Sequence, residues 1–299
     1  MNTRDLQYLV ALSDHRHFGK AAEVCFVSQP ALSMQIKKLE EALGIKLFER
    51  SNKSVLLTDA GIAITERARQ ILNQVEEIRD LAKLANDPYS GELKIGIIPT
   101  LAPYLLPLII PSLTKSFPKI SFYLTEERTS SLIEKLKAGK LDAAFLAHPV
   151  IEASFTCSQL FEEEFLLAAP NTHLLAKRKV IKRHDLEDQN ILLLDEGHCM
   201  REQTLAVCHK MNTSETQNFR ATSLETLRHM VAAGNGVTLM PKLAQQLSDN
   251  LSYIPFCSPK PMRSIGLYWR ISTAKNALLE NMVAQIKKIL AKQKLVTIL

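Results

Sequence analysis

The chain has 299 residues, 46% of them hydrophobic, and carries 37 Lys and Arg against 31 Asp and Glu. This composition excludes a wholly disordered chain or a fibrous repeat, and the length fits about two domains. A net charge of +6 is typical of nucleic-acid-binding proteins, but residues 1–90 carry 12 basic and 12 acidic side chains, so the whole excess lies in residues 91–299.

Neither the N-terminus nor the cysteine content points to export. Residues 1–10 include Arg4 and Asp5 and contain no apolar run followed by a small-residue cleavage site. The most apolar stretch, residues 101–111, is shorter than the roughly 20 residues of a membrane span. Five cysteines without a C-x-x-C pair predict neither a disulfide framework nor a zinc site. We therefore expect a cytoplasmic protein without a membrane partner, a metal or a cofactor.

Short helices followed by a hairpin are predicted for residues 1–58. Apolar residues recur at helical spacing in three segments. Ser28 is a candidate N-cap for the third segment, Pro30 suits its first turn, and Gly44 is a common residue at a helix end. This order of elements indicates a winged helix-turn-helix. The helices are expected at 6–12, 18–24 and 31–43, and the hairpin at 47–57.

The third predicted helix has a polar outer face. Its apolar stripe runs from Leu32 to Leu43 at steps of four, three and four, which leaves Ser33 and Gln35 off the buried face. The second helix of a helix-turn-helix enters the major groove, where such side chains reach base edges and phosphates. Arg50, near the hairpin tip, can reach the neighbouring DNA backbone. Periodicity alone equally allows a small three-helix domain with a solvated polar face.

A long helix is predicted from residue 59 to about residue 86. Its apolar residues follow alternating steps of four and three for three repeats, which is typical of a two-stranded coiled coil. We expect a homodimer that binds two DNA half-sites, although the same face could instead pack on its own domain. The seam consists of Ile64, Ala68, Ile71, Val75, Ile78, Ala82 and Ala85.

Strands and helices alternate from residue 91 to residue 292. This alternation predicts an α/β domain with a largely parallel sheet. Thr222 and Glu225 are expected to form a capping box at the start of one helix. Strands are expected at 93–98, 121–124, 143–147, 165–169, 191–194, 237–240 and 265–269, and helices at 104–116, 130–138, 223–233 and 277–292.

A long family pattern covers residues 18–61. The run from Phe18 to Glu40 contains V-S-Q-P-A-L-S-M-Q-I-K-K-L-E, and the motifs L-F-E-R and L-T-D-A-G follow it. These segments resemble the LysR-type transcriptional regulators. The resemblance implies a winged helix-turn-helix over 1–58, a dimerising linker helix over 59–90, and an effector domain over 91–299 that is similar to periplasmic binding proteins.

The same resemblance implies subdomains, DNA contacts and partners. The effector domain is expected to have two α/β subdomains, 91–161 with 268–299, and 162–267. The expected partners are double-stranded promoter DNA, RNA polymerase and further copies of the chain; the resemblance implies a homotetramer, whereas the seam indicates only a dimer. The positions that match the family's DNA contacts are Ser28, Gln29, Pro30, Ser33, Gln35 and Arg50.

A closer match lies in the effector domain. The motifs P-Y-L-L-P, G-H-C-M-R and F-R-A-T-S-L-E-T-L-R resemble the OxyR group of this family, which senses hydrogen peroxide and activates oxidative-stress genes. The resemblance implies that Cys199 reacts with peroxide and that Cys208 then forms a disulfide with it. The positions that match the peroxide pocket are Thr100, Thr129, His198, Arg201 and Arg263.

Peroxide sensing requires a thiolate, because the neutral thiol is a poor nucleophile. His198 and Arg201 flank Cys199 and are expected to stabilise its charge, together with the start of a helix. A continuous helix would separate Cys199 and Cys208 by about 13.5 Å, whereas a disulfide requires Cα atoms about 4.4–6.8 Å apart. Oxidation is therefore expected to unwind or bend this segment and to change how dimers bind DNA.

Two other functions remain open from the residues alone. In the first, the regulator binds a small anionic metabolite between the subdomains, with Thr100 and the helix start at Ser223 as the anion site. In the second, the chain is a thiol peroxidase. Residues 1–90 have no catalytic task in such an enzyme, so we expect a regulator and not an enzyme.

Overall fold

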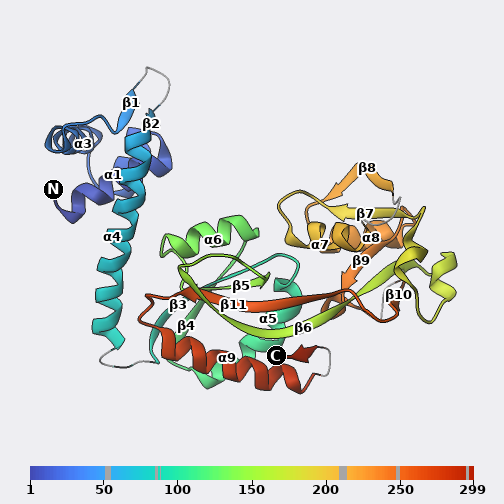
Figure 1. The fold of residues 1–299 in the computed structure, drawn as a ribbon. Coiled ribbons are helices and arrows are strands. Elements are labelled where there is room, and N and C mark those ends of the chain that lie inside the picture. The colour runs from blue at the N-terminus through green and yellow to red at the C-terminus, as the bar shows by residue number, and fades with distance from the viewer. Residues whose placement is uncertain (51–54, 85–86, 88, 209–213, 247–249, 294–295) are drawn as a thin grey trace. The chain divides into compact units, whose positions relative to one another are not determined.

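The computed structural model describes residues 1–299 except 51–54, 85–86, 88, 209–213, 247–249 and 294–295 (Figure 1). The chain forms two compact units, Met1–Ala85 and Asn86–Leu299, and each unit is described by itself. No helix in the described residues is long and apolar enough to cross a membrane.

The first unit is a winged helix-turn-helix followed by a long helix, as the sequence predicts. Leu9, Leu12, Leu32 and Ile36 are fully buried between its helices. Ser28 caps α3 by accepting a hydrogen bond from the backbone N–H of Ala31. The elements are α1 (Thr3–His15), α2 (Phe18–Val24), α3 (Gln29–Leu43), the hairpin β1 (Phe48–Arg50) and β2 (Val55–Leu57), and α4 (Asp59–Leu84). The expected hairpin tip lies outside the described residues.

The apolar seam of α4 has two parts. Ile64 and Ala68 pack against the core of the first unit, and Ala68 is 1% exposed. Farther along the helix, Ile71 and Ile78 are 40% and 66% exposed. The sequence allows the seam either to pack on its own domain or to pair with a second copy. In the structure, the first turns of α4 pack on their own domain, and the later turns leave an apolar face uncovered. Ala85 lies outside the described residues.

The second unit is built on an eight-stranded sheet with the order β10-β6-β11-β5-β3-β4, and β9 and β12 also pair with β6. Its strands are β3 (Gly91–Ile97), β4 (Ile120–Glu126), β5 (Ala143–His148), β6 (Phe155–Pro170), β9 (Thr238–Pro241), β10 (Leu251–Pro255), β11 (Met262–Arg270) and β12 (Thr297–Ile298). A separate parallel pair consists of β7 (Asn190–Leu194) and β8 (Ser214–Ala221).

Helices cover these sheets, and short 3-10 helices lie in the loops. The helices are α5 (Ala102–Ser116), α6 (Thr129–Lys137), α7 (Cys199–Cys208), α8 (Leu224–Ala232) and α9 (Asn276–Ala291). The 3-10 helices are η1 (Leu174–Lys177), η2 (Arg183–Leu186) and η3 (Lys242–Ala244).

The prediction of a largely parallel sheet is wrong. Strand β3 is parallel to β4 and β5, but β11 is antiparallel to both β5 and β6, and β6 is antiparallel to every strand with which it pairs. The reason is that β6 and β11 run the length of the unit in opposite directions and connect its two halves (Figure 1). Strands β8, β10 and β12 were not predicted, because none of them has a clear apolar run.

Two apolar cores lie at the two ends of these crossing strands. The first collects side chains from β3, β5, α5, α6 and α9, and the second collects them from β7, β9, β10 and α8. Ile265 and Leu267 of β11 belong to the first core, and Phe165 and Leu167 of β6 belong to the second. A site between the two cores is therefore held by elements of both.

The start of α8 differs from its prediction. Ser223, not Thr222, is the N-cap, and its hydroxyl accepts a hydrogen bond from the backbone N–H of Thr226. This register moves Glu225 one position too early to complete a capping box. Its carboxylate is instead used by tertiary contacts.

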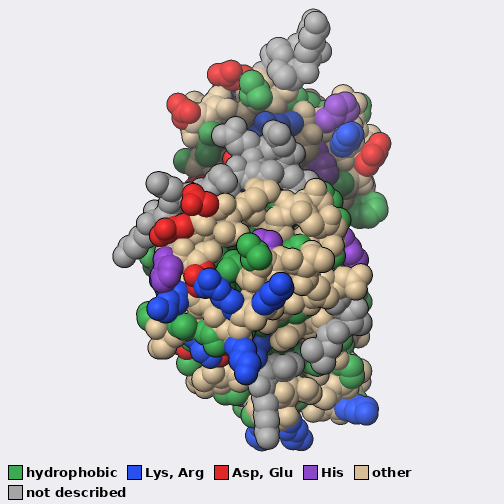
Figure 2. Space-filling view, turned by 90° about the vertical axis from the view of Figure 1, so that its right-hand side faces the viewer, with side chains coloured by type: hydrophobic (Ala, Val, Ile, Leu, Met, Phe, Trp, Pro, Cys, Tyr) green, Lys and Arg blue, Asp and Glu red, His purple; other side chains and the backbone are tan. Residues whose placement is uncertain are grey.

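The excess positive charge lies on the second unit. Figure 2 shows Lys and Arg side chains on its surface, singly and in small groups rather than as one continuous patch. Some are paired, since Arg178 lies 2.6 Å from Asp185 and Lys260 lies 2.9 Å from Glu164. This distribution is that of a solvated surface.

Candidate functional site

Cys199 is the first residue of α7 and lies where the two cores of the second unit meet. Its side chain packs against the first core, whereas Met200 beside it is buried in the second. The loop before the helix turns at Gly197, whose φ of +85° favours glycine. A Cβ at Gly197 would lie 3.2 Å from Cδ of Arg128, so this loop passes closely under a side chain from the first half.

Burial raises the pKa of the Cys199 thiol. The Arg263 guanidinium, the Thr129 hydroxyl, and the backbone N–H groups at the start of α7 act in the opposite direction, and the net effect is a raised pKa. The resting thiol is therefore protonated but lies next to groups that favour its thiolate. The backbone N–H groups at the helix start act in the direction that the sequence predicts, toward the thiolate.

Arg263 is the cation that acts on this thiol. Its side chain is fully buried, and it donates hydrogen bonds to the Thr100 hydroxyl (3.1 Å), the Thr100 carbonyl (3.2 Å) and Glu163 (2.8 Å). The structure thus brings Thr100 and Arg263 together with Cys199, although they are far apart in the sequence.

His198 does not supply the expected charge, and the role of Arg201 stays a prediction. Burial lowers the pKa of His198, and the nearby Arg128 lowers it further, so the imidazole is neutral. Arg201 donates a hydrogen bond to the Leu194 carbonyl (3.1 Å), which ties α7 to the end of β7. Adjacency in sequence suggested an ion pair, but burial neutralises the imidazole.

Three polar atoms around Cys199 are buried and have no hydrogen-bond partner among the described residues, apart from the contact of the Thr129 hydroxyl with the Cys199 thiol itself. They are Oγ1 of Thr129, Nε2 of His198 and Oε1 of Gln203. Buried polar atoms are almost always paired, so such a group indicates a site that a small polar molecule completes. Gln203 was missed from the sequence; the available signal was its position one helical turn after Cys199, on the same side of α7.

A pocket of about 430 Å³ opens beside this group. Pro99, Glu127 and Arg128 line it from the first half of the unit, and His198 and Thr222 line it from the second. The ion pair between Arg128 and Asp195 (3.2 Å) also joins the two halves. Thr129, the first residue of α6, follows Arg128 directly, so the positive end of that helix faces the pocket.

Cys208 is the last residue of α7, and its side chain lies outside the described residues. The helix between the two cysteines is continuous, so their Cα atoms are separated by about 13.5 Å along its axis. Among the described residues, Cys25, Cys157, Cys199 and Cys257 are free thiols.

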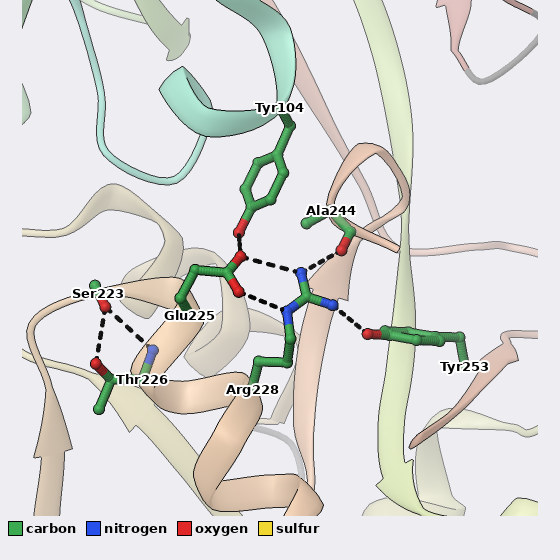
Figure 3. A network of polar contacts seen from close by, with 7 residues as sticks. All are labelled: Tyr104, Ser223, Glu225, Thr226, Arg228, Ala244 and Tyr253. Atoms are coloured by element: carbon green, nitrogen blue, oxygen red, sulfur yellow. Dashed lines mark hydrogen bonds and ion pairs between the residues drawn. The ribbon is translucent and has the colours of Figure 1, made fainter. Parts of the chain in front are cut away.

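A second polar network joins the two halves near the same pocket (Figure 3). Tyr104 of α5 donates a hydrogen bond to Glu225 of α8 (2.5 Å), and Arg228 donates to the same carboxylate (3.1 Å). Arg228 is 1% exposed and also donates to the Tyr253 hydroxyl and the Ala244 carbonyl. Tyr104, Glu225 and Arg228 belong to the motifs that the sequence singled out, whereas Ala244 and Tyr253 do not.

The expected DNA contacts lie in the first unit. Ser28, Gln29 and Pro30 are exposed at the start of α3, whereas Ser33 and Gln35 are half-buried on either side of its outer face. Arg50 ends β1, and its side chain lies outside the described residues. The exposed surface at the start of α3 is therefore formed by three of the expected DNA contacts, Ser28, Gln29 and Pro30.

Comparisons with known proteins agree with this arrangement. The family model for bacterial regulatory helix-turn-helix proteins of the lysR family matches residues 3–62, and the model for the LysR substrate binding domain matches residues 86–291. The chain belongs to the LysR family. It is therefore a helix-turn-helix regulator with a two-part α/β effector domain, and not an enzyme.

Several LysR family members are similar over nearly the whole chain. The "Hydrogen peroxide-inducible genes activator" of Dickeya chrysanthemi is 44% identical over 291 residues, which cover 96% of this chain and 95% of that protein. The "DNA-binding transcriptional dual regulator OxyR" of Escherichia coli is 44% identical over 290 residues, with the same coverage. A full-length OxyR variant from Pseudomonas aeruginosa has a TM-score of 0.78 at 38% identity and covers 96% of this chain and 95% of its own.

Proposed function

We propose that this LysR-type regulator is an activator that senses hydrogen peroxide through Cys199. The observation that carries the proposal is the buried thiol at the start of α7, held beside the Arg263 guanidinium and beside polar atoms without partners. The names of its relatives support the same signal. Thr100, Thr129, His198, Arg201 and Arg263 form or support the pocket.

In the first chemical step, the Cys199 thiolate attacks one oxygen of peroxide. The O–O bond breaks, the other oxygen leaves as hydroxide and takes up a proton to become water, and the sulfur becomes a sulfenic acid. The neutral His198 imidazole has a free nitrogen, and the Thr129 hydroxyl, which contacts the Cys199 thiol, has further capacity to hold a peroxide oxygen. Arg263 stabilises the thiolate during the attack.

In the second step, the thiolate of Cys208 attacks the sulfur of the sulfenic acid. The S–O bond breaks, a second water leaves, and a disulfide joins residues 199 and 208. Because α7 is continuous between them, it must unwind for the Cα atoms to come within about 4.4–6.8 Å. The loss of this helix changes the contacts between the two halves of the effector domain, and that change is the signal to the DNA-binding unit.

The protein forms a homodimer that is joined through α4, and the homodimers assemble into a homotetramer. This form binds promoter DNA in the cytoplasm and contacts RNA polymerase. The exposed part of the seam supports the dimer, since Ile71 and Ile78 have no cover within the described chain. DNA contacts are assigned to Ser28, Gln29, Pro30, Ser33, Gln35 and Arg50. Domains are assigned as 1–58, 59–90 and 91–299, and the effector subdomains as 91–161 with 268–299, and 162–267.

Peptide mapping of reduced protein after mild peroxide treatment tests the sensing mechanism. A disulfide between Cys199 and Cys208 is expected, and it should disappear in Cys199→Ser and in Cys208→Ser but persist in the matched control Cys257→Ser, which removes an exposed thiol. Footprinting of one promoter with reduced and oxidised protein, at stated salt, should show different protected regions.

Other outcomes would support the two alternatives. If the wild-type protein forms no such disulfide, and the Cys199→Ser variant still responds to a small anion, the chain would be a metabolite-responsive regulator. Repeated consumption of peroxide with a thiol donor, without sequence-specific DNA binding, would indicate a peroxidase.

Sedimentation of a seam variant tests the dimer. Ile78→Asp places a charge in the exposed apolar face and should weaken self-association by at least about tenfold, since a charge buried without a partner is costly. Ile62→Asp is the matched control, because Ile62 is 49% exposed on the same helix but lies off the seam. Equal effects of both substitutions would argue against the seam.

A further inference from the structure

Glu163 is a fully buried carboxylate that the motifs of the sequence did not single out. It lies on β6 directly opposite Arg263 on β11, and both side chains are 0% exposed. A carboxylate that is transferred from water to such a position loses several kcal/mol of solvation, so it is found there only with close partners. The position is where the two long strands cross from one core to the other.

Each oxygen of this carboxylate has a partner. Oε1 lies 2.8 Å from Nε and 2.7 Å from Nη2 of Arg263, and Oε2 accepts a hydrogen bond from the backbone N–H of Leu243 (3.0 Å). Leu243 belongs to η3, so the carboxylate is itself fixed to a second segment. Glu163 is therefore a rigid anchor for the guanidinium.

Thr100 holds the guanidinium from the other side. Nη1 donates to its hydroxyl (3.1 Å) and Nη2 donates to its carbonyl (3.2 Å). With Glu163 at one edge and Thr100 at the other, Arg263 has one available orientation. If the Glu163 side chain were shorter, Nε and Nη2 of Arg263 would lose their acceptor on this edge.

The groups that shift the pKa of Cys199 include Arg263 and Thr129 but not Glu163. Glu163 contacts this guanidinium directly, so it can act on the thiol through Arg263.

We propose that Glu163 is a positioning residue that holds Arg263 beside the Cys199 thiol and against Thr100. The proposal rests on the proposed role of Cys199 as the peroxide-reactive residue. According to this proposal, Arg263 is kept in position by the side-chain length of Glu163 and the placement of its acceptor oxygen, rather than by the charge of the carboxylate.

Two conservative substitutions separate reach from charge. Glu163→Asp keeps the charge but shortens the side chain by one methylene, so Arg263 follows the carboxylate away from Thr100 and the thiol. Glu163→Gln removes the charge but keeps an acceptor oxygen at full reach. Its amide nitrogen would face the Leu243 N–H, so that variant is expected to lose stability but to retain the position of Arg263.

The readout is the pH profile of Cys199 alkylation by iodoacetamide, measured by peptide mass spectrometry on the reduced full-length protein. Glu163→Asp should move the profile to higher pH and slow the reaction near neutral pH by about threefold or more, because less thiolate is present. Glu163→Gln should remain within about twofold of wild type. Both variants are checked for folding by circular dichroism.

Asp142→Asn is the matched control. Asp142 is also buried, pairs with Lys275 (2.8 Å) and accepts a hydrogen bond from the backbone N–H of Lys94 (2.8 Å). It should lose stability without any change in the alkylation profile. A shift as large in Asp142→Asn as in Glu163→Asp would overturn the proposal, because it would show general loosening.

The proposal is also overturned if folded Glu163→Asp has the wild-type profile, or if Glu163→Gln is shifted as much as Glu163→Asp. Alkylation reports on the thiol whether or not peroxide is the signal. A wild-type protein that forms no disulfide between residues 199 and 208 would contradict the proposed function, but would leave this measurement interpretable.

Discussion

Two buried arginines lie where the halves of the effector domain meet, and they are used differently. Arg228 has Glu225, Tyr253 and Ala244 as partners (Figure 3). Arg263 is equally buried and equally paired, but it stands beside a thiol whose other neighbours include buried polar atoms without partners. The first network joins the two halves by hydrogen bonds, and the second holds the Arg263 guanidinium beside the Cys199 thiol.

The difference is one of hydrogen-bond satisfaction. A fully paired network stabilises the fold, whereas each unpaired buried polar atom costs about 1–3 kcal/mol. The atoms at His198 and Gln203 therefore make the thiol pocket less stable than an apolar filling would be. Such a cost is expected where a ligand supplies the missing partners. The predictions below separate the two regions by measuring stability and thiol reactivity on the same variants.

Arg228→Leu should have the largest effect on stability. It removes a buried cation that contacts a carboxylate, a hydroxyl and a carbonyl, and the expected loss is about 3 kcal/mol in the free energy of unfolding by urea. The rate of Cys199 alkylation near neutral pH should remain within about twofold of wild type. A loss below about 1 kcal/mol, or a large change in that rate, would remove the distinction between the two arginines.

Tyr104→Phe should have the next largest effect. It deletes the hydrogen bond to Glu225 and little else, so about 1.5 kcal/mol should be lost, as is typical for a bond to a charged group. Urea denaturation of the reduced protein measures it. Since Tyr104 packs against both cores, Tyr104→Leu serves as the control for lost packing and should cost more.

Thr129→Val tests the thiol pocket from the opposite direction. It keeps the shape but removes a buried hydroxyl whose one contact among the described residues is the Cys199 thiol, so stability should change by less than about 1 kcal/mol. Oxidation of Cys199 by peroxide should nevertheless slow by about tenfold or more, measured by stopped-flow or quenched mass spectrometry. A clear loss of stability would mean that the hydroxyl is structural.

His198 should give the smallest effect, and it is visible only as a pH dependence. Burial lowers the pKa of its imidazole in the folded protein, so below about pH 6.5 the unfolded chain binds more protons than the folded one. Stability should therefore fall as the pH decreases through this range. The urea midpoint of His198→Gln should fall less steeply between neutral and mildly acidic pH; an unchanged slope would contradict the assignment.

The sequence was most informative where function depends on local pattern. Ser28 as N-cap of α3, the helix from Asp59, and the alternation of strands and helices beyond residue 91 follow from short-range propensities and periodicity, and the structure agrees with them. The pairing of β11 with β5 and β6 did not follow, because strand direction is set by partners that are distant in the chain.

The candidate site shows the same division. By its pattern, the sequence determined that the chain is a LysR-type regulator with a cysteine in a specific motif. Only the tertiary structure decided that Arg263, rather than the adjacent His198, is the cation that acts on the Cys199 thiol, and that Glu163 is the partner of this cation. The physical reason is that charge and reactivity depend on burial and on neighbours through space, and the side chains that act on the thiol, Arg263 and Thr129, are more than 60 residues from Cys199 along the chain.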